Sequence, residues 1–187
     1  MRRTPSQILG PYYPLAKPAE QDADLTTLAG RSDRAQGQVI YLSGRVLNRH
    51  GHPVAGAQME IWQANTHGKY RHPSDEYEAP IDPNFEGYAR LVSDAEGRYR
   101  FKSVKPGSYP DDASGTRRAP HIHLEVTGRV NRLVTQMYFA GEQLNETDRF
   151  LSTAGKNRSR LIVQFDPLPG DKEQALSASW DIVLHDG

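Results

Sequence analysis

The chain has 187 residues, of which 36% are hydrophobic and 16 are glycine, the composition of one ordinary globular domain, which excludes wholesale disorder and collagen-like repeats. Its 23 Lys and Arg residues balance 23 Asp and Glu residues, so there is no cationic excess for a phosphate backbone and we expect no nucleic-acid partner. The absence of Cys excludes disulfides, thiolate metal sites and a cysteine nucleophile, and apolar runs as short as residues 161–163 predict no membrane span.

Residues 1–37 are predicted to form an irregular arm. Four prolines between positions 5 and 18 interrupt any helix in it, and no apolar stretch follows Met1, so we expect no secretory signal and a cytoplasmic location. The apolar and aromatic residues between positions 8 and 15 are poor choices for a solvated tail. We therefore expect the arm to cover the body of the domain or a neighbouring subunit.

Residues 38–187 carry short alternating or β-branched runs separated by turn residues, which predicts one all-β domain built as an antiparallel β-sandwich. Asp94–Gly97 is interpreted as the turn of a hairpin that joins two of these strands. A helical turn is expected within residues 142–151. The predicted strands cover 39–42, 45–47, 54–64, 88–92, 98–104, 121–126, 132–139, 161–165 and 179–184.

Two long loops interrupt the strand pattern, at residues 65–86 and 105–120. Loops of this length inside a compact domain are usually functional, so we expect them to form an active site. Tyr77 lies in the first loop and Tyr109 in the second. Taken singly, a tyrosine on a polar loop is ordinarily a half-buried packing residue with its hydroxyl in water.

The triplet His121-Ile122-His123 is the strongest chemical signal in these strands. On a β-strand the two imidazoles point to one face and Ile122 to the other, which makes the histidines a natural metal-binding pair. Further ligands must be carboxylate, phenolate or backbone groups, since Cys is absent. Asp82 is one candidate, because two histidines and one carboxylate would suit a zinc or ferrous hydrolase or oxygenase.

The order of the segments and their residue sequences resemble those of the intradiol ring-cleaving dioxygenases over nearly the whole chain. The pattern is most similar to that of the iron-bearing subunits of protocatechuate 3,4-dioxygenases. The segments that carry the resemblance are residues 4–14 (TPSQILGPYYP), 60–65 (EIWQAN), 68–72 (GKYRH), 82–85 (DPNF), 92–101 (VSDAEGRYRF), 105–110 (KPGSYP), 118–123 (RAPHIH) and 132–139 (RLVTQMYF).

This resemblance implies a mononuclear non-haem Fe(III) held by Tyr77, Tyr109, His121 and His123. A hard ferric ion suits phenolate oxygen and lowers the pKa of a phenol, which is about 10 when free. The implied reaction is cleavage of a catechol between its two hydroxyl-bearing carbons by O₂ to a cis,cis-muconate, within aromatic hydrocarbon catabolism. Tyr109 would also receive a proton from the substrate when the substrate displaces it.

The resemblance also implies two further site residues. Arg118 matches an arginine that stabilises charge developing on the substrate, whereas the adjacent Arg117 is interpreted as a surface residue. Gln136 matches a position beside the site, although a satisfied core amide would explain it equally well. No ligand role is expected for the histidines at positions 50, 52, 67, 72 and 185.

The substrate is left open among protocatechuate, plain or substituted catechols, and hydroxyquinol. Many relatives have Trp after the Tyr-Pro pair, whereas Asp111 and Asp112 follow it here, and a carboxylate facing inward would repel an acidic catechol. The assembly is left open between a homo-oligomer and a partner subunit that completes the pocket. The alternative function is a non-catalytic, transthyretin-like β-sandwich binding module, since fold alone does not determine function.

Overall fold

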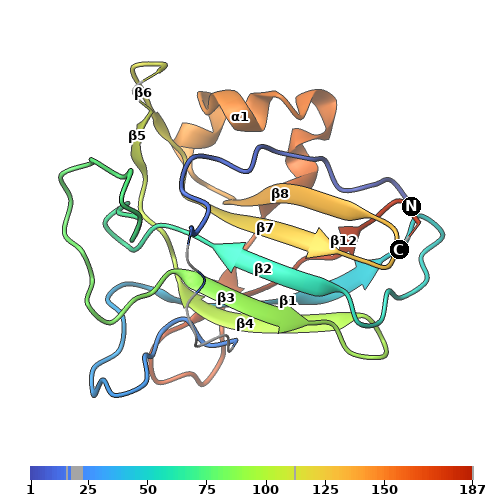
Figure 1. The fold of residues 1–187 in the computed structure, drawn as a ribbon, viewed down its shortest axis with the longest axis horizontal. Coiled ribbons are helices and arrows are strands. Elements are labelled where there is room, and N and C mark those ends of the chain that lie inside the picture. The colour runs from blue at the N-terminus through green and yellow to red at the C-terminus, as the bar shows by residue number, and fades with distance from the viewer. Residues whose placement is uncertain (16, 18–22, 112, 187) are drawn as a thin grey trace.

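The computed structural model describes residues 1–15, 17, 23–111 and 113–186 (Figure 1). Most of the strands lie in two five-stranded sheets. In the first sheet the order is β10-β11-β1-β12, and β4 pairs with the other edge of β1. The members of this sheet are β1 (Val39–Leu47), β4 (Arg98–Val104), β10 (Asp166–Pro167), β11 (Leu176–Ser179) and β12 (Ile182–Val183).

The second sheet has the order β3-β2-β7-β8-β9 and places β7 at its centre. Its members are β2 (Gln58–Trp62), β3 (Tyr88–Val92), β7 (His121–Thr127), β8 (Arg132–Phe139) and β9 (Ile162–Val163). A separate two-stranded ribbon pairs β5 (Tyr109–Asp111) with β6 (Thr116–Arg118). Three short helical segments follow β8, namely η1 (Gln143–Glu146), α1 (Arg149–Ser152) and η2 (Gly155–Arg160).

The core lies between the two sheets and follows from strand alternation. Ile40 and Leu42 of β1 point into it from one sheet, and Ile122, Leu124 and Val126 of β7 point into it from the other. All five are fully buried, and each such side chain contributes about 1.5–3 kcal/mol of transfer free energy. Because the residues of β7 that alternate with these face away from the core, His121 and His123 are directed to the opposite face of the sheet.

The sandwich is mixed rather than purely antiparallel. Strands β11 and β12 both run parallel to β1, and β9 runs parallel to β8, whereas the remaining strand pairs among the described residues are antiparallel. The parallel pairs involve strands near the end of the chain, which return across the sheet instead of turning back beside their sequence neighbour.

The predicted hairpin around residues 94–97 is wrong. Strand β3 pairs with β2 in the second sheet, and β4 pairs with β1 in the first, so the turn crosses from one layer to the other. Gly97 has φ +72° and its carbonyl accepts a hydrogen bond from Val46 N (2.7 Å), which anchors the crossing. Turn residues predict a reversal of direction, but they do not say whether the flanking strands share a sheet.

The two predicted long loops have different outcomes. Residues 65–86 contain no helix or strand, as expected, but residues 105–120 contain the β5–β6 ribbon, which the sequence pattern did not predict. The helical turn expected within residues 142–151 corresponds to η1 and the start of α1. Asp112 lies outside the described residues.

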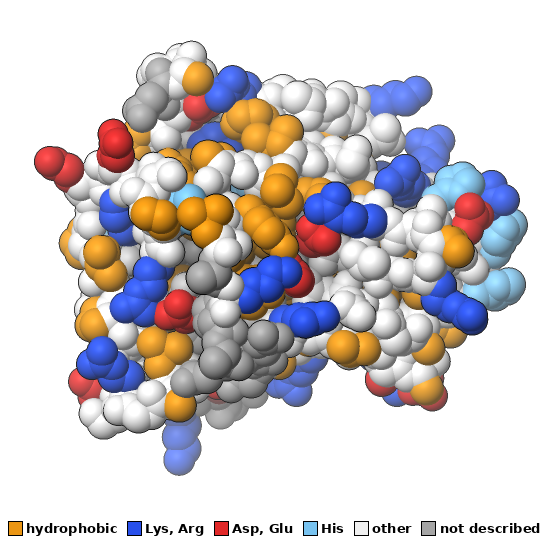
Figure 2. Space-filling model, viewed as in Figure 1, with side chains coloured by type: hydrophobic (Ala, Val, Ile, Leu, Met, Phe, Trp, Pro, Cys, Tyr) orange, Lys and Arg blue, Asp and Glu red, His pale blue; other side chains and the backbone are white. Residues whose placement is uncertain are grey.

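The described part of the N-terminal arm runs along β8 of its own chain (Figure 1). Gln7 N donates to Val134 O (2.9 Å), and the Thr135 hydroxyl donates to Pro5 O (2.8 Å). Figure 2 shows hydrophobic side chains grouped on this face, and acidic and basic side chains mixed over the rest of it. Nothing in the described part of the chain forms a helix long and apolar enough to cross a bilayer.

Candidate metal centre

His121 and His123 occupy the start of β7, between two neighbouring strands. His123 lies opposite Trp62 of β2 on one side and Gln136 of β8 on the other. Each histidine is 2% exposed, and their Nε2 atoms are 3.2 Å apart. The Trp62 ring stacks on His123 at 4.8 Å between centroids, which holds that imidazole in place.

Tyr109, on β5, brings an oxygen to the same point. Its hydroxyl lies 3.2 Å from His121 Nε2, and the side chain is 7% exposed. Three donor atoms from two separate segments therefore converge. Tyr77, in the 65–86 loop, is half-buried and lines a cavity of about 450 Å³ that Tyr109 also lines. The structure thus brings Tyr109, His121 and His123 into direct contact and places Tyr77 on the wall of the same cavity.

The protonation states of the histidines suit a metal cation. His121 Nδ1 lies 2.6 Å from Ala119 O. Because a carbonyl oxygen can only accept a hydrogen bond, Nδ1 carries the proton of the neutral ring, and the lone pair of Nε2 is available to a metal ion. Burial, with the positive charge of Arg118 as a lesser cause, holds the pKa of His121 well below its usual 6.5. Burial, and next His121, does the same for the pKa of His123. Both rings are therefore neutral at pH 7.

Burial raises the pKa of Tyr109 to about 12, against an opposing effect of Arg118. Without a cation at this point, Tyr109 is therefore a neutral phenol. A cation between the three donors would stabilise the phenolate and accept a lone pair from the Nε2 atom of each imidazole. The donor set consists of neutral imidazole and phenol groups that are buried and mutually directed, so it fits a metal ion.

Arg118 lies beside these donors in a buried hydrogen-bond network. Its Nη1 is 3.3 Å from the Tyr109 hydroxyl, its Nη2 donates to Gln136 Oε1 (2.8 Å), and its Nε donates to Asp148 Oδ2 (2.8 Å). Arg118 is only 4% exposed, so its charge is directed at the site rather than at solvent. Arg117, by contrast, is exposed and donates to Ser108.

Asp148 is a site residue that the sequence did not predict. Oδ2 accepts from Arg118 and from Ala119 N (2.9 Å), and Oδ1 accepts from Phe150 N and Leu151 N at the start of α1. One fully buried carboxylate therefore positions Arg118 and caps a helix. The Thr-Asp-Arg-Phe segment at 147–150 does contain an N-cap signal, but nothing in it indicates Arg118 as a partner.

Gln136 links this network to the N-terminal arm. Its Nε2 donates to Ile8 O (3.0 Å), which orients the amide so that Oε1 accepts from Arg118 and from the Tyr138 hydroxyl (2.8 Å). Gln136 is fully buried and is a satisfied amide in contact with Arg118. Tyr138 is a second residue of this network that was not predicted.

The arm also forms part of the wall around the donors. Gly10 has φ +80°, and a Cβ at that position would lie 3.0 Å from His123 Cε1, so the backbone passes directly over the ring. Tyr12 packs against Tyr70 (4.6 Å between centroids) and against the edge of Tyr109 (6.0 Å). The Gly-Pro-Tyr-Tyr-Pro run at 10–14 was the signal for these contacts, although its role was not predicted.

Asp82 and Asp111 do not act as the sequence suggested. Asp82 Oδ2 accepts from Gln36 N (2.7 Å) and Oδ1 from Asn84 N (2.9 Å), and no group of three His, Asp or Glu residues in the described ranges is arranged to hold a metal. The alternative site of His121, His123 and Asp82 is therefore wrong. Asp111 is paired with Arg149 through two hydrogen bonds (2.5 and 3.0 Å), which neutralises the carboxylate.

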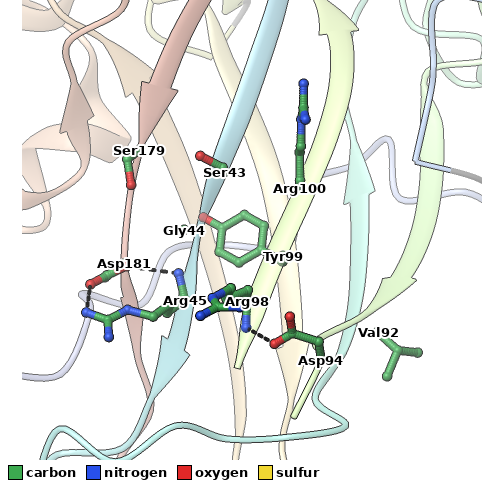
Figure 3. A pocket seen from close by; sticks show the side chains of 10 residues that line it. All are labelled: Ser43, Gly44, Arg45, Val92, Asp94, Arg98, Tyr99, Arg100, Ser179 and Asp181. Carbon is green, nitrogen blue, oxygen red and sulfur yellow. Dashed lines mark hydrogen bonds and ion pairs between the residues drawn. The ribbon is translucent and has the colours of Figure 1, made fainter. Parts of the chain in front are cut away.

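A larger hollow of about 570 Å³ is lined by residues of β1, β4 and β11 and by the end of β3 (Figure 3). It includes Val92, at the end of β3 that lies farthest along the sheet from Trp62 and His123. Two of its arginines are engaged locally, since Arg45 pairs with Asp181 (3.3 Å) and the Arg98 guanidinium pairs with Glu96 (3.7 Å). It contains none of the predicted site residues, so size alone does not identify the reactive cavity.

Comparisons with known proteins show which proteins the chain is similar to. A family profile described as "Dioxygenase" matches residues 8–186. The chain is 42% identical over 178 residues to the beta chain of protocatechuate 3,4-dioxygenase from Burkholderia cepacia, covering 93% of this chain and 76% of that one. It is 34% identical to hydroxyquinol 1,2-dioxygenase from Rhodococcus opacus, covering 97% of this chain and 63% of that one.

Its fold matches that of the dioxygenase domain of a dioxygenase–carbohydrate-binding protein fusion from Streptomyces sp. SirexAA-E, with a TM-score of 0.76, 25% identity and complete coverage of both chains. The family match spans the arm from residue 8 onward, both long loops and the strand with the two histidines. The chain therefore belongs to the family of intradiol ring-cleaving dioxygenases.

Proposed function

We propose that this chain is a mononuclear non-haem Fe(III) dioxygenase that cleaves a catechol between its hydroxyl-bearing carbons with O₂ to give a cis,cis-muconate. The observation that carries the proposal is the buried convergence of His121 Nε2, His123 Nε2 and Tyr109 Oη, with adjacent donors 3.2 Å apart. Tyr77, on the wall of the shared cavity, completes the proposed ligand set. When bound, the ferric ion would draw electron density from the catecholate so that the ring can react with O₂.

The residues of this chain supply proton transfer and charge. Burial raises the pKa of Tyr109 to about 12, so its Oη is a strong proton acceptor when a catechol displaces it, and it would hold the proton that the substrate hydroxyl loses. Arg118 would stabilise negative charge on the substrate oxygens, because its guanidinium is buried and held by Gln136 and Asp148. The arm at Gly10 and the Tyr12 ring would exclude water from one side.

The alternative is a non-catalytic, transthyretin-like module that keeps only the scaffold. A non-catalytic module does not account for the buried guanidinium of Arg118, which is held by hydrogen bonds beside the neutral imidazoles of His121 and His123. Relatives that are named alpha and beta chains support a partner subunit as part of the proposal, whereas a homo-oligomer stays a prediction. A cytoplasmic location stays a prediction.

The test is the purified protein from iron-replete cells, assayed for metal content, visible absorbance and oxygen uptake with a panel of catechols. We expect a coloured protein from phenolate-to-iron charge transfer, with the colour lost or strongly shifted in Tyr77→Phe and Tyr109→Phe. Tyr41→Phe is the matched control, because Tyr41 lies on the first sheet beneath Arg100 and Lys102. An iron-free, colourless protein, or a yellow semialdehyde product, would contradict the proposal.

A further inference from the structure

The cavity that Tyr77 and Tyr109 share is electrically polarised along its depth. At its inner end Tyr109 is in contact with the guanidinium of Arg118, which is 4% exposed. At its outer end the wall includes Glu76 and Glu78, both exposed. The remaining described residues of the wall are uncharged, namely Tyr12, Ser74, Tyr77, Tyr109 and Pro110.

The two glutamates are not neutralised as their neighbours are. Among the described residues, neither Glu76 nor Glu78 forms an ion pair, whereas Asp75 pairs with Lys69 (3.3 Å). Arg117 is an exposed cation beside this wall, since it lies over the Tyr77 ring at 5.8 Å and donates to Ser108 O (2.7 Å). Two carboxylates against one guanidinium leave the mouth of the cavity negative.

A catechol that enters this cavity has two chemically different ends. Its hydroxyls must reach the donors at the inner end, beside Arg118, so a substituent across the ring is directed towards the mouth. The walls of a cleft have a low dielectric constant, so they concentrate the electric field of its charged residues inside the cleft. Such a field changes the local concentration of charged ligands by about tenfold or more. A positive substituent would complement the glutamates, and a carboxylate substituent would be repelled.

Building on the proposed function, we propose that this site selects catechols that carry a cationic substituent over catechols of equal size that carry a carboxylate. Glu76 and Glu78 are the specificity-determining residues. The Asp111 carboxylate plays no part in this selection, because Arg149 neutralises it.

The experiment uses three probes of similar size with the iron-loaded protein: 4-(2-aminoethyl)catechol, 4-ethylcatechol and 3,4-dihydroxyphenylacetate. Dissociation constants are measured without oxygen, where no turnover occurs, and kcat/KM is measured in air. We expect the amine to exceed the carboxylate by about tenfold or more in both measurements, with the ethyl compound between them. Added salt should reduce the difference, because exposed charges are screened.

The variant series is Glu76→Gln, Glu78→Gln and the double variant, with Glu96→Gln as the matched control. Glu96 is an exposed glutamate in the turn between β3 and β4, away from the cavity, so its removal should leave the preference intact. The double variant should bring the amine-to-carboxylate ratio close to one. An unchanged ratio in the double variant, or a preference for the carboxylate in the wild type, would overturn the inference.

Failure of this inference can be separated from failure of the proposed function. Ring cleavage without a charge preference overturns the inference alone. A charge preference in anaerobic binding without ring cleavage overturns the proposed function and leaves the inference standing. Absence of both binding and cleavage overturns both.

Discussion

Arg118 is a buried cation whose nearest acidic partner, Asp148, is fully buried as well. Removing one member of such a pair leaves the other as an uncompensated charge and costs about 3–5 kcal/mol of folding stability. We therefore expect Arg118→Ala to lose stability in addition to slowing turnover. Turnover should fall by about 10²–10³-fold, the cost of removing one preorganised charge-stabilising donor. Urea unfolding and steady-state kinetics measure the two effects separately.

The double variant Arg118→Ala/Asp148→Asn separates stability from catalysis. The Asp148→Asn substitution removes the negative charge that the loss of Arg118 leaves unpaired. It keeps a side-chain oxygen that can cap α1, so a part of the lost folding stability should return. Turnover should not return, because the guanidinium is still absent. If turnover and stability recover together, Arg118 acts through the fold rather than on the substrate.

The N-terminal arm contributes to the site as an element, through its backbone. Gly10 has φ +80°, a conformation that costs an L-residue about 1–2 kcal/mol, and an added Cβ would contact His123. We expect Gly10→Ala to lower the melting temperature and to reduce the iron content or shift the visible band. Both are measured on the purified protein, by thermal unfolding and by metal analysis with absorbance.

Gly30→Ala is the matched control for this element. Gly30 has φ +76° and no atom within 4 Å of the added Cβ, so it carries the backbone cost without the contact. Its iron content and spectrum should equal those of the wild type. Equal effects of the two substitutions on the iron site would show that the arm does not hold His123.

The stability of the whole molecule should depend on pH. Burial of His121 and His123 in the folded protein lowers the pKa of each below the usual 6.5. The unfolded chain therefore binds more protons than the folded one as the pH falls through 6.5, and the stability present above that pH is progressively lost. We expect the metal-free protein to have a lower free energy of unfolding at pH 5.5 than at pH 7.5. Urea titrations at several pH values measure this.

The variant His121→Gln/His123→Gln tests the assignment of that pH dependence. Without the two imidazoles, the slope of stability against pH between 5.5 and 7.5 should flatten. A wild-type stability that does not change over this range would mean that the histidines are not held neutral by the fold.

The sequence by itself determined the features that depend on local periodicity and on motif. The alternation of His121, Ile122 and His123 directs the imidazoles to one face, because successive side chains of a strand point in opposite directions. The apolar alternation also predicted most of the strands and the two-sheet core. The residue sequences of the segments around Tyr77, Tyr109, His121 and His123 indicated the family, and the resemblance implied these four residues as the ligand set.

Only the tertiary structure decided which distant groups meet. Strands β3 and β4 are joined by a short turn and yet lie in different sheets. Asp148 holds Arg118 from 30 residues away, Ile8 orients Gln136 from the arm, and Arg149 neutralises Asp111. The physical reason is that these contacts are set by the packing of two sheets, which brings together residues whose positions along the chain carry no information about each other.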